Sequence, residues 1–415
     1  MLSNASLAAA GPLNPPAGAI ASTGKTLTEV EPRTAVNAVN TPAGSNHTYV
    51  ITASGSYYLT ADLISSGTTN GLLINAPRVT LDLNGFSIVN GGTGQFGILL
   101  NAHDQNVTIR NGTVSGWGSL GIGHNGGNAP AISVENIFFR NCARGIRVPG
   151  PLRVTRCTAR NCSIIGFECM SPHALFESCL AEACTSVGFY LNPYSVAQGC
   201  IANACGTGFF GNDGSRFIDC SATANTSLGF DLGAGVLLHR CTARGNGSAN
   251  AAGNGNIRAG VRALITQCLS DSGFYRGILT NHAGAISDCV VTSCSGTGIE
   301  TGDGCSVERC NVSNNSGNGV QIAADCRIHG NIIDYHTGAG ASAVRCIGGS
   351  NSIEQNTLTR AAVGVDMTNS VNNVVLNNRV SCTTPFAVNF GGNWYPQITA
   401  ANTGAGASPF ANVTY

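Results

Sequence analysis

Apolar residues in this chain fall into short clusters, and a glycine precedes most of them. The clusters are about three to six residues long, rich in β-branched and aromatic types, and separated by polar, glycine-rich turns. Apolar and polar positions alternate within a cluster, as in a strand with one buried face. No 3.6-residue spacing persists over a useful length, so a helical repeat is excluded. The pattern therefore predicts a protein built from short strands.

The clusters recur at a regular interval of 20 to 24 residues, apart from two longer gaps. A glycine followed by an apolar residue stands at Gly97, Gly121, Gly145, Gly166, Gly188, Gly208, Gly229, Gly277, Gly298, Gly319 and Gly364. The first gap holds a repeat near Gly255-Asn256-Ile257 and a loop, Gly245–Gly253; the second hides a degenerate repeat near Ala343-Val344. Such a repeat is too short to bury a core alone and is stable only when stacked on copies of itself. We therefore expect a solenoid of about fourteen coils.

The cysteines keep the same interval. One set, the first cysteine column, is Cys157, Cys179, Cys200, Cys220, Cys241, Cys268, Cys289 and Cys310, and a second is Cys142, Cys162, Cys184, Cys205 and Cys294. Stacked coils bring equivalent residues to ~4.8 Å, so we expect buried thiols packed in columns. Zinc would need four ligands at paired short spacings, and parallel side chains hold Cβ atoms too far apart for good disulfides. Most of the other five cysteines, Cys169, Cys305, Cys326, Cys346 and Cys382, are also expected to be buried.

This repeat, together with the opening segments GPLNPPAG, KTLTEVEPRT, SGSYYLTADL and VTLDLNGFSI, resembles right-handed parallel β-helix proteins of the pectate-lyase-like superfamily. The opening segments are similar to those of secreted bacterial β-helix proteins of mostly unknown function. The resemblance implies an all-β fold, a single-stranded right-handed parallel β-helix with coils of about 21–24 residues. We assign residues 1–45 to an extended Pro/Ala/Gly-rich arm, 46–395 to the β-helix and 396–415 to a C-terminal tail.

Charge and composition narrow the partners. The formal net charge is zero, and charged residues make up only 10% of the chain, which argues against nucleic acid or an anionic membrane as a partner. No apolar run approaches the ~20 residues of a membrane span. The first residues lack the basic start and apolar core of a signal peptide, yet the resemblance implies an extracellular or cell-surface location. The arm is a candidate element for homo-oligomerisation.

One outward column of the predicted sheet carries the candidate site. In the strand after each repeat glycine the first residue points inward and the second outward, and the outward column, with Arg258 in the equivalent place of the repeat near Gly255-Asn256-Ile257, reads Leu73, Leu99, Gly123, Arg147, Glu168, Tyr190, Phe210, Asp231, Arg258, Leu279, Glu300, Gln321 and Asp366. From Arg147 to Gln321 the column mixes acids, arginines and two aromatic rings, a composition that suits a chain-like glycan. The predicted substrate-binding residues are Arg147, Glu168, Tyr190, Phe210, Arg258 and Gln321.

Catalysis on this column would need particular groups. A glycosidase needs two carboxylates ~5–9.5 Å apart; Asp213 with Asp231, or Glu300 with Asp303, could meet that, whereas Glu168 and Asp231 are three coils apart. A lyase or epimerase needs a base, for which Tyr190, Arg258 and His282 are the outward candidates. The predicted catalytic residues are Asp231, Glu300, Asp213, Asp303 and His282. The Asp-Asp doublet and Gly-His-Gly of polygalacturonases are absent, and the acids are too sparse for a Ca²⁺ site, so no metal or cofactor is predicted.

Two functions remain open. The first is a secreted carbohydrate-active protein, a hydrolase or lyase, that binds and cleaves a polysaccharide along this column. The alternative is a non-catalytic structural or adhesive surface protein in which the β-helix is a spacer and a mixed polar column merely prevents lateral association. If the column proves inert, the triplet Asp334-Tyr335-His336 and the loop Gly245–Gly253 are the next places to search.

Overall fold

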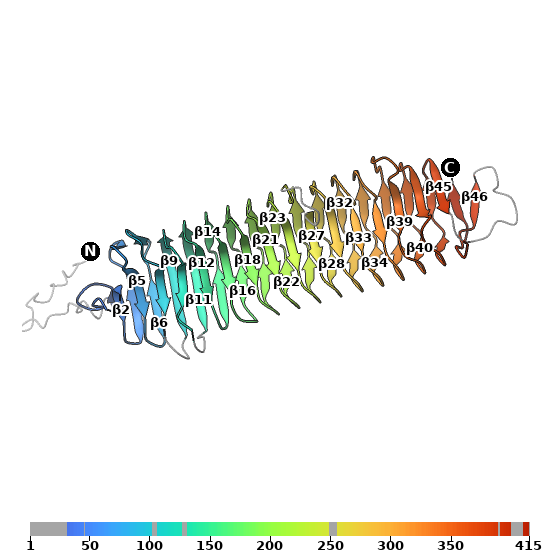
Figure 1. The fold of residues 1–415 in the computed structure, drawn as a ribbon. Helices are drawn as coiled ribbons and strands as arrows, with labels where there is room; N and C mark the ends of the chain where they lie inside the picture. The colour runs from blue at the N-terminus through green and yellow to red at the C-terminus, as the bar shows by residue number, and fades with distance from the viewer. Residues whose placement is uncertain are drawn as a thin grey trace, which may run out of the picture. The chain divides into compact units, whose positions relative to one another are not determined.

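Most coils of the chain contain three short strands. The computed structural model describes residues 31–44, 46–101, 106–126, 131–248, 255–388, 391–399 and 410–414. Residues 34–415 form one compact unit, an elongated stack of coils running from β2 to β46 (Figure 1). Every strand pairing between successive coils is parallel, and the described residues contain no helix. The predicted parallel β-helix is therefore confirmed. Residues 1–30 of the predicted arm lie outside the described residues.

One strand of each coil joins a sixteen-stranded parallel sheet, called here the front sheet. Its strands are β2 (His47–Ile51), β5 (Asn70–Ile74), β8 (Phe96–Leu100), β10 (Leu120–His124), β12 (Arg144–Val148), β15 (Ile165–Cys169), β18 (Val187–Leu191), β21 (Thr207–Gly211), β24 (Leu228–Leu232), β27 (Gly255–Ala259), β30 (Arg276–Thr280), β33 (Ile299–Thr301), β36 (Val320–Ile322), β39 (Ser342–Cys346), β42 (Val363–Met367) and β45 (Thr384–Val388). This agrees with the prediction of about fourteen coils; the two end strands, β2 and β45, contain no Gly-apolar pair that would have counted them.

The other strands form a second sheet of two parallel ladders that share the long strands β9 and β11. The first back ladder is β1 (Thr34–Ala35), β3 (Gly55–Tyr58), β6 (Val79–Asp82), β9 (Val107–Ser115), β11 (Ile132–Arg140), β13 (Leu152–Thr155), β16 (Leu175–Glu177), β19 (Val196–Gln198), β22 (Arg216–Ile218), β25 (Leu237–His239), β28 (Leu264–Thr266), β31 (Ala285–Ser287), β34 (Ser306–Glu308), β37 (Arg327–His329), β40 (Ser352–Glu354) and β43 (Val374–Leu376). The second back ladder is β4 (Leu63–Ser65), β7 (Ser87–Asn90), β9, β11, β14 (Thr158–Arg160), β17 (Leu180–Glu182), β20 (Ile201–Asn203), β23 (Ser221–Thr223), β26 (Thr242–Arg244), β29 (Leu269–Asp271), β32 (Val290–Thr292), β35 (Asn311–Ser313), β38 (Ile332–Asp334), β41 (Thr357–Thr359), β44 (Arg379–Ser381), β46 (Gln397–Thr399) and β47 (Asn412–Thr414).

Like residues stack on like residues in the core. Phe167, Phe189, Phe209 and Phe230 lie on successive front strands with ring centroids 4.8–4.9 Å apart and nearly parallel planes. Phe217, from the first back ladder, meets the edges of Phe209 and Phe230 at 5.7 and 5.9 Å. All five rings are fully buried. Offset-stacked and edge-to-face pairs are the favoured aromatic geometries, so the middle of the β-helix is held by an aromatic core.

The repeat glycine is fixed by the contact between coils. A Cβ atom on Gly145 would lie 2.5 Å from the carbonyl oxygen of Gly166, and one on Gly166 would lie 2.7 Å from that of Gly188. Real Cβ atoms do not approach backbone oxygen so closely, so any side chain here would force neighbouring coils apart. The regular glycine in the sequence thus marks where the backbones of adjacent front strands leave no room for a side chain.

The corner between the two back ladders explains the first cysteine column. Before each column residue the chain turns through a left-handed residue, such as Arg156 (φ 52°) before Cys157. Because of this turn, the backbone amide of the column residue has no partner in a neighbouring strand. It donates a hydrogen bond to the column side chain of the next coil instead. The Cys220 amide donates to the sulfur of Cys241 at 3.4 Å, and the Cys310 amide to Oδ1 of Asn331 at 2.8 Å. Asparagine can replace cysteine in such a column, as Asn331 does after Cys310, because both side chains are small hydrogen-bond acceptors.

All eighteen cysteines are free thiols, and seventeen of them are buried; Cys382 is half-buried. The flanking registers Thr155↔Glu177 and Thr158↔Leu180 place Cys157 beside Cys179. Cys305 and Cys326, which the sequence left unassigned, occupy a third corner column that Asn351 and Asn373 continue, since the Cys326 amide donates to Oδ1 of Asn351 at 2.8 Å. Burial raises the pKa of the Cys142 thiol to about 11.

Candidate functional site

Six outward residues on successive front strands form what we call the central strip: Arg147, Glu168, Tyr190, Phe210, Asp231 and Arg258. The strand registers place them side by side in that order. Five steps of ~4.8 Å make the strip ~24 Å long. Its order is symmetric, with an aromatic pair at the centre, a carboxylate on each side and an arginine at each end. The sequence predicted this arrangement from the alternation of side chains along a strand.

The ends of the strip are ion pairs. Asp231 accepts from Nε of Arg258 at 2.8 Å and from its Nη2 at 2.7 Å, and this bonding raises the pKa of Arg258. At the other end Glu168 accepts from Arg147 at 3.1 Å and lies 3.0 Å from Nε of Arg144, the first residue of β12. Two arginines therefore share one carboxylate at this end, which leaves one unit of positive charge there.

The centre of the strip is an aromatic ridge. The rings of Tyr190 and Phe210 lie 4.7 Å apart with an interplanar angle of 15°. Each ring covers one face of the other, so the pair presents ring edges outward instead of two free flat platforms. Both residues are half-buried. The ridge is an apolar step between two hydrogen-bonding clusters.

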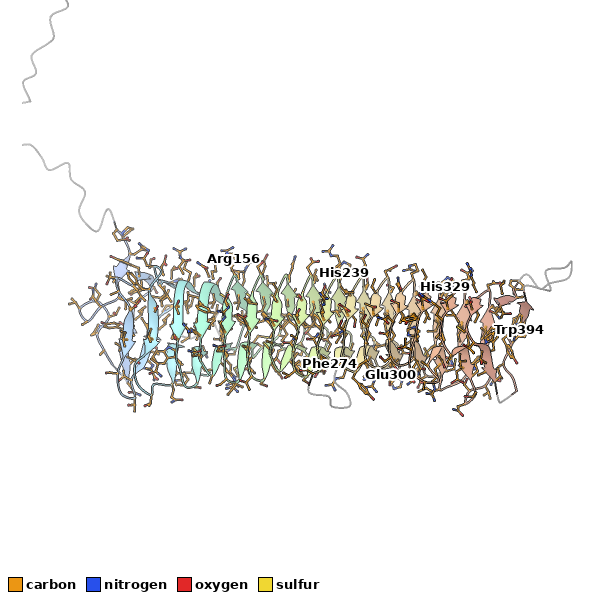
Figure 2. All side chains as sticks on the ribbon, turned by 90° about the horizontal axis from the view of Figure 1, so that it is seen from above. Arg156, His239, Phe274, Glu300, His329 and Trp394 are labelled. Carbon is orange, nitrogen blue, oxygen red and sulfur yellow. The ribbon has the colours of Figure 1, made fainter. Side chains whose placement is uncertain are left out.

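The remaining predicted residues of the front face also have partners. Glu300 accepts from Nε of Arg276 at 2.5 Å, and Oε1 of Gln321 accepts from Nδ2 of Asn318 at 3.2 Å. Figure 2 shows Glu300 and Phe274 on one side of the β-helix and Arg156, His239 and His329 on the opposite side. Phe274 is 48% exposed and directly precedes Tyr275, whose ring lies under the guanidinium of Arg276 at 4.7 Å.

Three predicted catalytic residues lie in turns that follow the front strands. Oδ1 of Asp213 accepts the Ala234 amide of the next coil at 2.8 Å, and Oδ1 of Asp303 accepts the Ala324 amide at 2.9 Å. Nδ1 of His282 accepts the Asp303 amide at 3.0 Å and lies 3.3 Å from the carboxylate of Asp303. These contacts join each turn to the next coil. Asp213 and Asp303 thus hold corresponding structural positions, and each keeps one carboxylate oxygen for other contacts.

The two alternative places differ in character. Asp334 pairs with Arg360 of the following coil and accepts a hydrogen bond from Thr359 at 2.6 Å, and this bonding lowers its pKa. His336 points into the core, where neither ring nitrogen has a hydrogen-bond partner. The triplet is therefore split between surface and core. Residues 249–254 of the loop Gly245–Gly253 lie outside the described residues.

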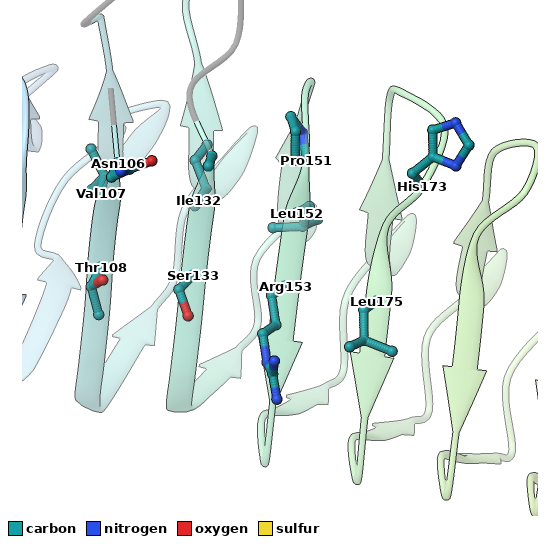
Figure 3. A pocket seen from close by; sticks show the side chains of 11 residues that line it. Asn106, Val107, Thr108, Ile132, Ser133, Pro151, Leu152, Arg153, His173 and Leu175 are labelled. Atoms are coloured by element: carbon teal, nitrogen blue, oxygen red, sulfur yellow. The ribbon is translucent and has the colours of Figure 1, made fainter. Parts of the chain in front are cut away.

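Sequence reasoning missed a pocket on the first back ladder (Figure 3). It has a volume of about 360 Å³ and is lined on β9, β11 and β13 by Val107, Ile132, Leu152 and Arg153, with His173 at its end. His173 stacks on Tyr194 at 5.7 Å. The apolar outward residues of β16 and β19, Leu175 and Val196, were the signal for an unusually apolar stretch of this ladder, but a column of single residues does not reveal a hollow.

Metal-ligating side chains do not gather in this structure. Among the described residues no group of three or more His, Cys, Asp or Glu could hold a metal ion. No helix in the part of the chain that the structure describes could cross a membrane.

Residues 96–245 match a family model described as a right handed beta helix region. Solved structures with a similar course include the A-module of a mannuronan C-5 epimerase from Azotobacter vinelandii, at 16% identity, covering 82% of this chain and 90% of that one with a TM-score of 0.35. Tailspike protein 3 of bacteriophage CBA120 matches at 12% identity, covering 85% and 59% with a TM-score of 0.38. The catalytic unit of an alpha-1,3-glucanase from Streptomyces thermodiastaticus matches at 12%, covering 83% and 63% with a TM-score of 0.35. Likeness this distant carries no argument about function. The comparison with curated proteins yields no match.

Proposed function

We propose that this chain, a right-handed parallel β-helix protein, binds a polysaccharide along the central strip of its front sheet. The observation that carries the proposal is the symmetric order of the strip: an aromatic ridge with an arginine–carboxylate pair on each side. A polymer of regular repeat suits a surface of regular repeat, since successive sugars can meet successive strands ~4.8 Å apart.

The chemistry of the strip matches that of a sugar chain. Sugars present both hydroxyl groups and apolar C–H patches. The ridge of Tyr190 and Phe210 offers apolar contact area, and the carboxylates of Glu168 and Asp231 accept hydrogen bonds from hydroxyl groups. The guanidinium of Arg258, 45% exposed, has donors left for hydroxyl or anionic groups. Because the ion pairs fix both charged partners beforehand, binding would order few side chains.

Cleavage of the polysaccharide is a second part of the proposal. Asp231 and Glu300 are the leading candidates for acid, base or nucleophile, with Asp213, Asp303 and His282 behind them. Each of the four carboxylates binds an arginine or a backbone amide. The same bonding favours the rival reading of a non-catalytic adhesive protein, so binding without turnover is a real alternative.

The test of binding uses the ridge. Tyr190→Ala and Phe210→Ala should each weaken binding to a polysaccharide found by screening, by tenfold or more, with little change in melting temperature. Trp394→Ala is the matched control, since Trp394 is an aromatic residue 53% exposed that bridges to β43 of the first back ladder, away from the strip. The proposal fails if a polysaccharide binds and all three variants bind it equally well.

The test of cleavage uses the carboxylates. Asp231→Asn and Glu300→Gln keep shape and remove charge, so whichever residue acts in the reaction should lose turnover by at least a hundredfold while binding is largely kept. Reducing-end release detects hydrolysis, and absorbance of unsaturated products detects a lyase. A polysaccharide that binds tightly and is never altered would assign the protein to the adhesive class instead.

We further propose an extracellular or cell-surface location, where the protein would meet a polysaccharide long enough to follow the central strip. The eighteen thiols are compatible with an oxidising environment because burial withholds them from reagents. Homo-oligomerisation through the N-terminal arm remains part of the proposal, to be checked by comparing the mass in solution of the full chain with that of a chain lacking residues 1–30.

A further inference from the structure

Eight cysteines on eight consecutive coils form an unbroken line through the interior of the β-helix. The first cysteine column runs from Cys157 to Cys310, and each of its side chains is at most 2% exposed. Ile137 precedes the column and Asn331 follows it; the Ile137 amide donates to the sulfur of Cys157 at 3.4 Å. No other residue type interrupts the column, so it offers seven gaps between neighbouring sulfur atoms.

The spacing of the column suits a particular class of ion. Neighbouring parallel strands lie ~4.7–4.9 Å apart, and two metal–sulfur bonds of about 2.3 Å in line span ~4.6 Å. A cation between two sulfurs of adjacent coils would therefore have two ligands opposite one another. Zinc needs four ligands, and no cluster of three converges in the described residues. Soft monovalent cations, copper(I) above all, prefer thiolate sulfur.

We propose that the first cysteine column binds soft monovalent cations, one in each gap between the sulfurs of successive coils. The site is distinct from the central strip and does not depend on the proposed glycan function. Each interior sulfur bridges two cations, one in the gap before it and one in the gap after it.

The charge of the buried column does not change when it fills. Each cation that enters displaces one thiol proton to solvent, so one positive charge replaces another; seven cations replace seven protons and one thiol stays protonated. No net charge is buried, which avoids the large cost of an unpaired ion in an apolar interior. The amides that donate to the sulfurs of Cys157, Cys241 and Cys289, each at 3.4 Å, also favour the thiolate. A cation can enter the column only when a corner of the β-helix opens transiently. Because a bare cation is small, a small opening is enough.

The experiment counts cations in variants that break the line at different places. Silver(I), as the nitrate in chloride-free buffer, is the probe, because it is soft and redox-inert. The protein is equilibrated for hours and dialysed against free methionine to remove loosely held silver; retained silver and released protons are then measured.

The expected losses depend on position. Cys220→Ser removes two gaps and should retain two fewer silver ions, Cys157→Ser at the end should retain one fewer, and Cys346→Ser, outside all three corner columns, should retain the same number as the parent. Asn331→Cys should extend the line and retain one more. Cys142–Cys205 and the pair Cys305 and Cys326 add four gaps that none of these variants changes. One proton should be released for each silver ion.

Other outcomes overturn the proposal. Equal loss of one silver ion in all three serine variants would mean that thiols bind silver singly. Retention of no silver by the folded parent would mean that the column is closed to cations. Circular dichroism and melting temperature verify folding, and if Cys220→Ser does not fold, the difference between Cys157→Ser and Cys346→Ser decides the question.

Discussion

Asp231 and Arg258 are joined by two parallel hydrogen bonds, at 2.8 and 2.7 Å, across neighbouring strands of the front sheet. Asp219 and Arg240 form the same two-bond pair, at 2.7 and 2.8 Å, on a corner of the back sheet. Exposed ion pairs contribute little to stability, roughly 0–1 kcal/mol. The two pairs therefore allow function to be separated from structure.

We predict that Arg258→Gln and Arg240→Gln alter the melting temperature by no more than a few degrees, but that only Arg258→Gln weakens polysaccharide binding, by about tenfold. Thermal unfolding and binding titrations at low and high salt are the measurements. Equal effects of both substitutions on binding would show that the charge of Arg258 acts through the whole protein and not at the strip.

The repeat glycines should tolerate no side chain. Gly166→Ala would place Cβ 2.7 Å from a backbone oxygen of the next coil, and forcing the coils apart should cost about 1–3 kcal/mol or more. At the exposed Gly118, a Cβ would meet the flexible end of Gln95 at 3.3 Å and the backbone oxygen of Gly94 at 3.6 Å, an ordinary contact distance, so Gly118→Ala should be close to neutral. Denaturant unfolding compares the two; equal stabilities would contradict the packing argument.

His336 should make stability depend on pH. Burial lowers its pKa from the ordinary 6.5 to about 4, against smaller opposing effects of the nearby backbone at Asn315 and Val312 and of the Asp334 charge. A group whose pKa is lowered by folding contributes its stability above its unfolded pKa and loses it as the pH falls. Between pH 6.5 and 4 the free energy of unfolding should fall by on the order of 3 kcal/mol from this group.

The substitution that tests His336 takes its residue type from the same column of stacked side chains. Asn315 holds the equivalent place one coil earlier, so His336→Asn should fold and lose much of this pH dependence. His282→Asn, on a side chain 64% exposed, should keep it. Unfolding curves at pH 7 and pH 4.5 measure the difference, and a parent protein equally stable at both values would refute the role of His336.

Thiol accessibility gives a further prediction. In the native protein a bulky disulfide reagent should label about one cysteine, the half-buried Cys382, whereas denaturation should expose all eighteen. Rapid labelling of many thiols in the folded state, or mass evidence for several disulfides, would contradict the burial described here.

The sequence carried the fold because its period is visible in single residues. The glycine interval located the front strands, and alternation placed Arg147 through Arg258 on one outward column. It could not show that Tyr190 and Phe210 cover one another, because side-chain rotation is not encoded in strand period. Nor could it show that Asp213 and Asp303 bind turn amides.

The role of the cysteines was hidden for a different reason. The left-handed residues that precede them are as varied as Arg156, Ser178 and Asp219, and only one of the eight, Gly199, is a glycine, so no single residue type marks the turn. The third corner column was missed because its residue types vary: after Ser195 and Ser215, the registers place Val236, Ala263 and Gly284 before Cys305 and Cys326.

Wherever the amide of a corner-column residue donates to the side chain of another column residue, that side chain comes one coil later in the chain. The stack of coils therefore has a direction. The corner amides of its last coils need hydrogen-bond acceptors from residues that follow the repeats. The amide of Asn373 is accepted by Asn393 at 3.0 Å and that of Asn378 by Asn412 at 3.0 Å. During synthesis, each new coil would complete the one made before it, and the closing residues would emerge last. Until Asn412 has been synthesised, the last coil of a ribosome-bound chain would thus expose corner amides without acceptors. A chain truncated before this residue should therefore be able to pair its last coil with a strand from another molecule.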